Sequence, residues 1–215
     1  MKIYLATGNV NKKREVQELF PEHTIVIPKD EGIDFDPEET GTTFYENSLI
    51  KARALYELVK CPVLADDSGI CVDALDGAPG IYTSRYAGPD FMKGKPDGSK
   101  ISQEEQNAFL VRQTREAVEK GKAPGPSAHY TCSMVLYMGK DRLFVAQETM
   151  EGEIIGNIEE SRGTGGFGYD PIFYLPEEKR TAAELTADEK NAISHRGKAS
   201  RIIKSIADQL LSESK

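Results

Sequence analysis

The sequence contains few cysteines and few histidines, and neither set has the spacing of a metal site. Its three cysteines, Cys61, Cys71 and Cys132, are an odd number without a C-x-x-C pair. We therefore expect buried reduced thiols and no zinc site. Its three histidines are far apart in the chain, and none stands at metal-ligand spacing from another.

Long hydrophobic runs and excess positive charge are also missing. No apolar run approaches the roughly 18 residues of a membrane-spanning helix, and the first residues lack a signal-peptide pattern. We expect a cytoplasmic protein without a membrane partner. Lysine and arginine total 27 against 35 aspartates and glutamates, a net charge of -8. This balance argues against nucleic-acid binding through a basic surface, and a small anionic ligand requires cations gathered at one site.

What the chain does contain is typical of a globular protein. It has 215 residues, of which 39% are hydrophobic and 29% charged. This length fits one large domain or two lobes that share a core. Periodic repeats are not evident.

The segment from Val63 to Gly69 reads V-L-A-D-D-S-G and carries the strongest chemical signal. Its pattern predicts a buried strand that ends in a sharp, charged turn. Asp66 and Asp67 repel each other and are costly to desolvate, so a cation or a proton-transfer role would compensate them. A solvated acidic turn explains the local pattern about as well.

A second signal lies at the start of the chain. Residues 2–6 read as a strand, residues 7–11 as a glycine turn and residues 12–20 as a helix. Such a helix start presents free backbone N–H groups and the positive end of the helix dipole to an anion. Thr7, Asn9 and Lys12 add side-chain donors, although Asn9 also fits a simple helix cap. The pattern is not a Walker A loop.

Thr43 and Glu46 form a capping box that predicts a helix from residue 44 to about residue 60. One stripe of this helix is expected to face the core and consists of Phe44, Ser48, Lys51, Leu55 and Leu58. Lys51 is unusual there. Its side chain either extends to the edge of the core or reaches a buried anion.

The later segments predict a hairpin, a glycine loop and further helices. Alternation over residues 129–138 and 143–150 predicts an antiparallel hairpin, which with residues 153–158 suggests a lobe with its own β meander. Residues 162–173 interleave four glycines with Phe167 and Tyr169, which fits either a stacking platform or an ordinary turn. Capping boxes predict helices from residues 102 and 186, and the last helix is expected over residues 198–211.

Together these parts are those needed to bind a nucleoside triphosphate with Mg²⁺, a hard ion that takes carboxylate and phosphate oxygens. Lysines and backbone N–H groups would hold the remaining phosphate charge.

The sequence also resembles the inosine triphosphate pyrophosphatase family, the XTP/dITP diphosphatases. The matching segments run in order along nearly the whole chain and include residues 6–12, 39–44, 46–47, 51–52, 65–69, 77–82, 84–86, 163–173, 181–186 and 194–197. Residues 90–127 match poorly. Pro126 stands where the family often has a basic residue.

The resemblance implies an α/β fold with an elongated, mixed, twisted β-sheet flanked by helices, and a nucleotide cleft between two lobes. We expect one domain over residues 1–215, with lobe one formed mainly by 1–88 and 171–215 and lobe two mainly by 89–170. It also implies a homodimer. The implied activity is hydrolysis of ITP, dITP and XTP to the monophosphate and pyrophosphate, which removes aberrant purine nucleotides from the precursor pool.

The resemblance further implies roles for individual residues. Asp67 would be the proton acceptor, and Glu39 and Asp67 would bind Mg²⁺, with a role for Asp66 left open. Ser68 would contact the substrate. The phosphates would be bound by Thr7, Gly8, Asn9, Val10, Asn11, Lys12 and Lys51. The base pocket would consist of Phe167, Gly168, Tyr169, Asp170, Lys190, His195 and Arg196.

Two functions of other classes remain as alternatives. A binding module would retain a purine nucleotide without hydrolysing it. A phosphatase with Asp66 or Asp67 as covalent nucleophile would release orthophosphate, although the adjacent pair lacks the D-x-D spacing usual for that chemistry.

Overall fold

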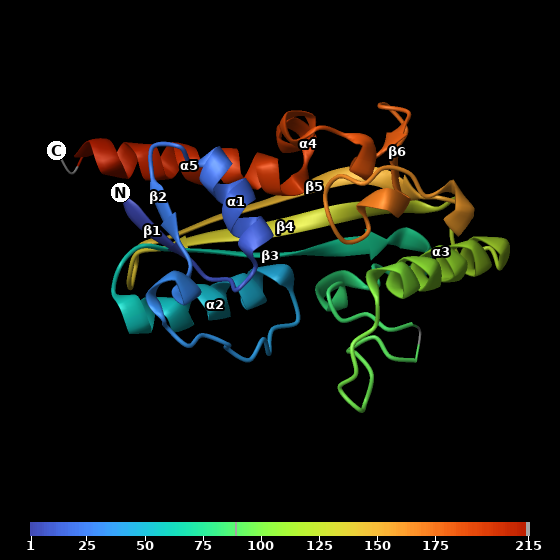
Figure 1. The fold of residues 1–215 in the computed structure, drawn as a ribbon, viewed down its shortest axis with the longest axis horizontal. Helices are drawn as coiled ribbons and strands as arrows, with labels where there is room; N and C mark the ends of the chain where they lie inside the picture. Colours follow the sequence, from blue (N-terminus) through green and yellow to red (C-terminus); the bar gives the residue numbers. More distant parts are fainter. Residues whose placement is uncertain (89, 214–215) are drawn as a thin grey trace. The chain divides into compact units, whose positions relative to one another are not determined.

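The structure, a computed structural model, describes residues 1–88 and 90–213. Its strands and helices are β1 (Lys2–Leu5), α1 (Val10–Leu19), β2 (Thr24–Val26), α2 (Phe44–Val59), β3 (Val63–Val72), α3 (Gln103–Glu119), β4 (Ser127–Tyr137), β5 (Leu143–Ile154), β6 (Phe173–Leu175), β7 (Arg180–Thr181), α4 (Ala187–Ile193) and α5 (His195–Glu213). The strands form a sheet in the order β2-β1-β3-β4-β5-β6-β7 (Figure 1). The predicted α/β class with a mixed sheet is confirmed, since β1 runs parallel to β2 and β3 whereas β5, β6 and β7 are antiparallel.

The described chain forms two compact units. Among the described residues, unit 1 contains 1–67, 132–148 and 195–213, and unit 2 contains 68–88, 90–131 and 149–194. The predicted lobes assigned residues 68–88 and 171–194 to lobe one and residues 132–148 to lobe two, which differs from this grouping. Three of the four unit boundaries fall inside strands, in β3, β4 and β5, and the fourth falls between α4 and α5. Residues 89, 214 and 215 of the predicted lobes lie outside the described residues.

The expected separate β meander is wrong. Strands β4 and β5 extend the sheet that begins with β2, β1 and β3, because β4 lies next to β3. Strand β5 continues to Ile154 where two shorter strands were expected. Three capping boxes are confirmed, at the starts of α2, α3 and α4. The last helix begins at His195 and not at residue 198, since the break after α4 is a single extended residue, Ser194.

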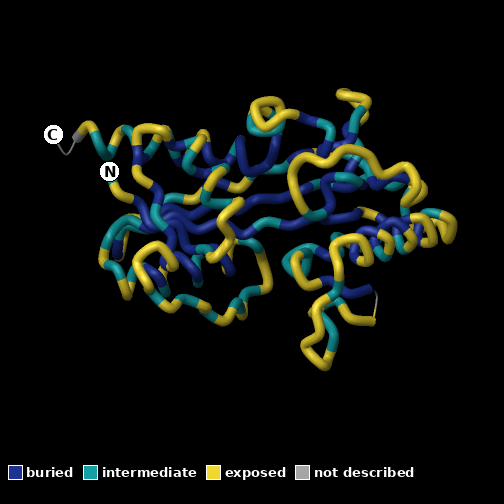
Figure 2. Tube along the Cα trace, viewed as in Figure 1, coloured by how far each residue is buried: buried dark blue, intermediate teal, exposed yellow. Residues whose placement is uncertain are grey.

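The strand residues of unit 1 are largely buried, as the dark blue of the central strands in Figure 2 shows. Ile3 and Leu5 of β1 pack with residues of α1 and α5, including Val16 and Ile203. The alternate residues of β1 pack instead with α2, where Leu55 is buried. Because side chains alternate between faces along a strand, helices cover both faces of this part of the sheet.

The predicted turn at residues 66–69 is wrong, because β3 continues without a break from Val63 to Val72 and is buried at nine of ten positions. Leu64 belongs to the core beneath α1 and α5, whereas Val63 and Ala65 belong to the core beneath α2. By the same alternation, Asp66 lies on the α1/α5 face and Asp67 on the α2 face. The two adjacent carboxylates therefore point to opposite sides of the sheet.

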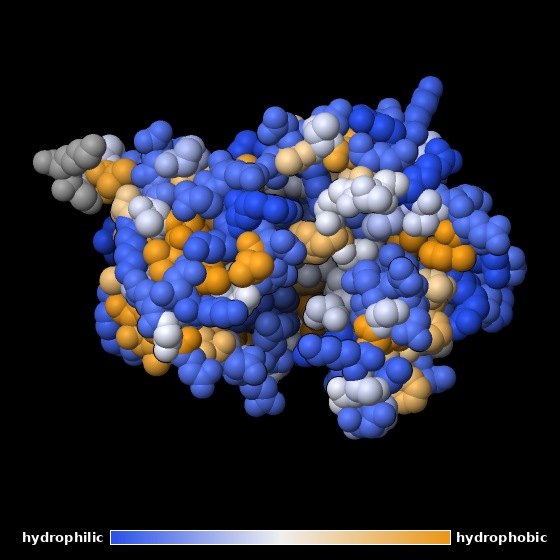
Figure 3. All heavy atoms as spheres, in the orientation of Figure 1, coloured by the Kyte–Doolittle hydropathy of each residue, from blue (hydrophilic) through white to orange (hydrophobic). Residues whose placement is uncertain are grey.

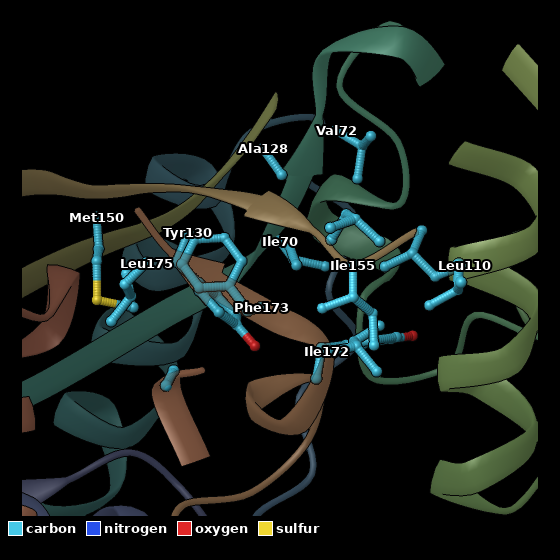
Figure 4. Packing of buried hydrophobic residues seen from close by; sticks show 14 of the residues in the cluster. Ile70, Val72, Leu110, Ala128, Tyr130, Met150, Ile155, Ile172, Phe173 and Leu175 are labelled. Carbon is cyan, nitrogen blue, oxygen red and sulfur yellow. The ribbon is translucent and has the colours of Figure 1, made fainter. Parts of the chain in front are cut away.

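Unit 2 has a core of its own, shown in Figure 4. Leu110 of α3 packs in it with Ile70 and Val72 of β3, and Ile172 precedes β6. The rings of Tyr130 and Phe173 meet edge to face, with centroids 4.8 Å apart. This arrangement fixes the start of β6, directly after the glycine loop of residues 162–170.

No helix within the described residues is both long enough and apolar enough to span a membrane. Most of the surface visible in Figure 3 is coloured hydrophilic, with smaller apolar patches. One of the exposed apolar residues is Leu58, with 59% of its surface exposed, so the predicted core stripe of α2 ends at Leu55, one turn before the helix does.

Candidate active site

The turn after β1 has the geometry of a helix cap open to solvent. Asn9 is the N-cap of α1, and its side-chain oxygen accepts hydrogen bonds from the backbone N–H groups of Asn11 and Lys12, at 2.9 and 3.3 Å. The Thr7 hydroxyl accepts from the N–H of Asn9 at 3.1 Å. Residues 8–11 are exposed. Capping by Asn9 and access of an anion to the helix start are therefore compatible.

Asp66 is the centre of a buried ionic network on the α1/α5 face. Its Oδ2 accepts from Lys12 Nζ at 3.0 Å and from Arg196 Nε and Nη2 at 3.3 and 3.2 Å. Arg196 Nη1 also donates to Glu15 at 2.7 Å. Burial by itself would raise the pKa of Asp66, but the charges of Lys12, Arg196 and Lys51 outweigh it and hold this pKa well below its ordinary value. Asp66 is therefore a permanent anion that positions two cations.

Asp67 faces α2 and has different partners. Its Oδ1 lies 3.2 Å from Lys51 Nζ, and its Oδ2 accepts from Asn47 Nδ2 at 3.3 Å. Strand β1 pairs with β3 only as far as Leu64, and the N–H of Asp67 beyond it donates to the Ser48 hydroxyl at 3.1 Å. The unusual lysine in the core stripe of α2 thus reaches a buried anion.

Burial gives Asp67 and Lys51 distinct protonation behaviour. Desolvation raises the pKa of Asp67, and the Lys51 charge only partly offsets this effect. Desolvation lowers the pKa of Lys51, but the charges of Asp67, Asp66 and Glu39 outweigh it, so the pKa of Lys51 is raised. Lys51 stays charged, and Asp67 is a stronger base than an ordinary aspartate.

Two carboxylates are in a position to hold a metal ion. Glu39 Oε1 and Asp67 Oδ1 each lie 3.2 Å from Lys51 Nζ, so both face the same cationic group. No cluster of three or more metal-ligating side chains occurs among residues 1–88 and 90–213. Mg²⁺ commonly uses one or two carboxylates and completes its shell with water and substrate phosphates. The donor set therefore fits a Mg²⁺ ion bound together with phosphate, and does not fit a fully protein-ligated metal.

The glycine loop of unit 2 supports an exposed aromatic ring. Asp170 is buried, and its Oδ2 accepts from the N–H of Phe167 at 2.7 Å and from Lys190 Nζ at 2.6 Å. Lys190 Nζ also lies 5.1 Å from the centroid of the Phe167 ring. Phe167 has 37% of its residue surface exposed. This loop thus presents a flat ring and a cation together.

Tyr169 and Gly168 have structural roles in this loop. Tyr169 is buried, and its hydroxyl donates to the carbonyl of Thr83 at 3.2 Å. Burial raises the pKa of this hydroxyl well above its ordinary value. The carbonyl of Gly168 accepts from Asn107 of α3 at 3.5 Å. Any contact of these two residues with a ligand would use backbone atoms or the ring edge.

The predicted site residues fall into the two units. Unit 1 contains residues 7–12, Glu39, Lys51, Asp67, His195 and Arg196, and unit 2 contains Ser68, residues 167–170 and Lys190. Within unit 1 the structure brings Lys12 and Lys51 to the adjacent aspartates. His195 is buried in the first turn of α5, beside Arg196. The predicted base pocket combines residues of both units and stays a prediction.

Two residues of the unit 1 site were not predicted. Glu15 binds Arg196, and Asn47 binds Asp67. A helix-spacing signal could have found both, because Glu15 lies three residues after Lys12 in α1 and Asn47 lies four residues before Lys51 in α2. Residues at these spacings share one helix face.

Comparison with known proteins finds relatives over nearly the whole chain. A model of the Ham1 family matches residues 3–206. The dITP/XTP pyrophosphatase of Treponema denticola is 53% identical over 95% of this chain and 99% of its own length, and that of Escherichia coli K12 is 42% identical over 94% and 95%. A solved HAM1 protein from Coxiella burnetii superposes with a TM-score of 0.80 at 38% identity, over 97% of this chain and 99% of that one. This chain belongs to the Ham1 family.

Proposed function

We propose that this protein is a nucleoside triphosphate pyrophosphatase that hydrolyses ITP, dITP and XTP to the monophosphate and pyrophosphate. The observation that carries the proposal is a lysine beside each of the adjacent aspartates of β3, Lys12 of α1 at Asp66 and Lys51 of α2 at Asp67. The two pairs lie on the two faces of β3, just beyond Leu64, where its pairing with β1 ends. Such a site offers cations for a polyphosphate beside a carboxylate of raised pKa. The similarity to the dITP/XTP pyrophosphatases of Treponema denticola and Escherichia coli supports the substrate class.

In the proposed reaction Asp67 accepts a proton from water. The water oxygen forms a bond to the α-phosphorus, and the bond from this phosphorus to the oxygen bridging to the β-phosphorus breaks. Pyrophosphate leaves with the bridging oxygen. The raised pKa of Asp67 supports this role, because a base is most useful when its pKa lies nearer the working pH. Lys12, Lys51 and the start of α1 hold the phosphate oxygens in this scheme.

The metal in this proposal is Mg²⁺, held by Glu39 and Asp67. When bound it neutralises charge on the phosphate oxygens and stabilises the leaving pyrophosphate. The convergence of both carboxylates on the Lys51 ammonium supports the assignment. A homodimer and a cytoplasmic location stay predictions from the sequence.

Base selectivity is proposed to rest on the 6-oxo group that hypoxanthine and xanthine share. The Phe167 ring would stack on the base, and the Lys190 ammonium would donate a hydrogen bond to its 6-oxo group. The ammonium lies 5.1 Å from the centroid of the ring. Adenine has a 6-amino donor at that position, so a donor on the protein would lose its partner. One unmade buried hydrogen bond costs about 1–3 kcal/mol, and two or three of them give large discrimination.

Product analysis with ITP and Mg²⁺ tests the activity directly. We expect IMP and pyrophosphate in equal amounts, without orthophosphate. Orthophosphate together with a phosphoenzyme would replace the proposal by the covalent phosphatase. ITP retained without release of pyrophosphate would replace it by the binding module.

A comparison of ITP, XTP, GTP and ATP turnover tests the base selectivity separately. We expect ITP and XTP to react faster than ATP by a factor of at least about 10, since each unmade hydrogen bond contributes about 1–3 kcal/mol. Equal rates for ATP and ITP would defeat the readout of the 6-oxo group while leaving the hydrolytic chemistry standing.

A further inference from the structure

Unit 2 contains a pocket of ≈ 510 Å³ that is lined by none of the residues of the candidate active site. We call it the loop pocket. It lies between the segment after η3 (Gly80–Tyr82) and the start of α3. Four of its lining residues are cationic: Arg85, Lys93, Lys95 and Lys100. Two are serines, Ser84 and Ser99, and among the described residues that line it none is acidic. This composition is unusual in a chain with a net charge of -8.

The cations of the loop pocket are not neutralised by close ion pairs. Within the described part of the chain none of the four takes part in an ion pair within 4.0 Å, in contrast to Lys12, Lys51 and Lys190. Arg85 and Lys93 both lie beside the ring of Tyr82, at 5.4 and 5.5 Å from its centroid. Two positive groups held at one ring repel each other, and an anion between them would relieve that repulsion.

Two carboxylates near the loop pocket accept hydrogen bonds from neighbouring serines, and one of these serines, Ser99, lines the pocket. Asp97 accepts from the N–H of Ser99 at 2.9 Å, and Glu105 accepts from the N–H and hydroxyl of Ser102 in the capping box of α3, both at 3.0 Å. Lys95 is close enough to lower the pKa of each, after the larger effect of these hydrogen bonds. The positive charge of Lys95 is therefore partly offset by Asp97 and Glu105. The uncompensated positive charge of the loop pocket belongs to Arg85, Lys93 and Lys100.

The backbone gives this loop a defined shape. Gly94 has a φ of +99°, and a side chain there would begin 3.5 Å from the carbonyl oxygen of Arg85, so the loop folds back on the segment that carries Arg85. Hydrogen bonds from the N–H of Ala87 to Phe91 and from the N–H of Gly98 to Lys95 close two further turns, at 3.1 and 3.0 Å. Figure 1 shows the loop in green before α3, and Figure 2 shows it mostly exposed or half-buried.

We propose that the loop pocket binds a small, multiply charged phosphate anion of the oligophosphate class. Arginine matches phosphate oxygens with a planar pair of N–H groups, lysines add point charges, and the Ser84 hydroxyl adds a neutral donor. A concave site with cations on several sides suits a compact anion. Pyrophosphate and the polyphosphate chain of a nucleotide share this chemistry, and the experiment below distinguishes them. The proposal does not depend on the hydrolytic activity.

The first experiment measures protection of individual lysines from acetylation by acetic anhydride, read by mass spectrometry of the full-length wild-type protein in EDTA. We expect pyrophosphate to slow acetylation of Lys93 and Lys100 by at least threefold. Lys120 and Lys122, at the other end of α3, should react at an unchanged rate. If sodium chloride at the same ionic strength slows acetylation of these two lysines equally, the effect is charge screening and the proposal is overturned. The proposal is also overturned if no phosphate compound slows their acetylation.

The second arm of this experiment identifies the source of the phosphate. An α,β-methylene nucleoside triphosphate, which cannot be cleaved at that bond, is compared with pyrophosphate at equal concentration. Stronger protection by the analogue assigns the pocket to nucleotides, and equal or stronger protection by pyrophosphate assigns it to the free anion. Both outcomes support the oligophosphate class.

A variant with a matched control completes the test by titration calorimetry with pyrophosphate. The double variant Lys93→Gln/Lys100→Gln should bind one equivalent of pyrophosphate fewer than the wild type. Lys120→Gln/Lys122→Gln removes the same charge about 25 Å away, given the 1.5 Å rise per residue along a helix, and should bind as the wild type does. Equal stoichiometry in both variants would overturn the proposal. If the wild-type protein does not hydrolyse ITP but pyrophosphate still protects Lys93 and Lys100, that result would count against the proposed function alone.

Discussion

Adjacent residues of one strand have pKa values shifted in opposite directions in this protein. The charges of Lys12 and Arg196 outweigh burial and lower the pKa of Asp66, whereas burial raises the pKa of Asp67 and the charge of Lys51 offsets this only in part. The alternation of side chains along β3 produces this separation, because neighbouring residues contact helices on different faces of the sheet. One carboxylate is thereby suited to fix cations and the other to exchange a proton.

Replacement of Asp67 tests the proton-accepting role. We expect Asp67→Asn to lower kcat for ITP by about 10²–10⁴-fold, the usual contribution of a positioned base, while the far-UV circular dichroism stays unchanged. In the wild type kcat/KM should fall as the pH drops through the raised pKa of Asp67, because the base works only when deprotonated, and the midpoint should lie above 3.8. Turnover by Asp67→Asn equal to that of the wild type would remove Asp67 from this role.

Replacement of Asp66 should affect stability. Asp66→Asn keeps the shape of the side chain but leaves Lys12 and Arg196 with a neutral partner. We expect the free energy of unfolding, measured with urea, to fall by about 3–5 kcal/mol. Asp208→Asn is the control, since that carboxylate is 39% exposed in its ion pairs and its loss should cost about 1 kcal/mol or less.

The pH dependence of the Asp66 effect follows from its lowered pKa. A carboxylate with a folded-state pKa below its unfolded value contributes stability that is present above the unfolded pKa and is lost as the pH falls towards the folded one. The gap between wild type and Asp66→Asn should therefore be constant from about pH 5 to pH 8 and narrow only below about pH 4. A gap that narrows near neutral pH would contradict this account.

At the scale of single elements, the glycine loop offers a matched pair of substitutions. Gly166 and Gly168 have nearly the same φ, +68° and +69°. A Cβ at Gly166 would lie 2.0 Å from Asp170 Oδ2 and 2.9 Å from Lys190 Nζ, whereas one at Gly168 would meet nothing within 4 Å. Both alanine variants should lose about 1–2 kcal/mol of stability from the left-handed backbone conformation.

Only Gly166→Ala should also disturb the pairing of Asp170 with Lys190 and the ring of Phe167. We expect its KM for ITP to rise by about tenfold, the equivalent of about 1.4 kcal/mol of lost binding, while that of Gly168→Ala stays near the wild-type value. Steady-state kinetics and thermal unfolding of both variants separate the two effects. The same KM in both variants would show that the loop does not bind the substrate.

Local patterns in the sequence predicted the elements that local chemistry controls. The three capping boxes, the strand before the turn at residues 7–9 and the cap at Asn9 all follow from residues within four positions of each other. The course of β3 could not be predicted this way. A strand that carries Asp66 and Asp67 through a buried sheet requires partners from α1, α2 and α5, up to 130 residues away in the chain. The contact of Arg196 with Asp66 could not be predicted for the same reason, and its predicted contact with the base stays a prediction.

At the scale of the whole molecule, unit 1 is built from three separate segments of chain and unit 2 from two. The last segment of unit 1 is α5, whose Ala199, Ile203 and Ala207 are fully buried in the core with β1 and α1. It also provides Arg196, the partner of Asp66. The core of unit 1 and its ionic network therefore depend on a helix that the chain reaches only after completing unit 2.

A chain that ends at Ser194 tests this dependence, because it keeps both segments of unit 2 and loses α5. This change removes three fully buried side chains and a buried cation. We expect the loss in free energy of unfolding to exceed the stability of unit 1, because a whole domain is stable by only about 5–15 kcal/mol. We expect amide hydrogens of β1 and β2, measured by exchange and mass spectrometry, to lose their protection. A chain that ends at the exposed Ser212 is the control and should exchange as the full chain does. Protected β1 amides in the chain that ends at Ser194 would show that unit 1 folds without its last segment, and the site at Asp66 would then need another source of stability.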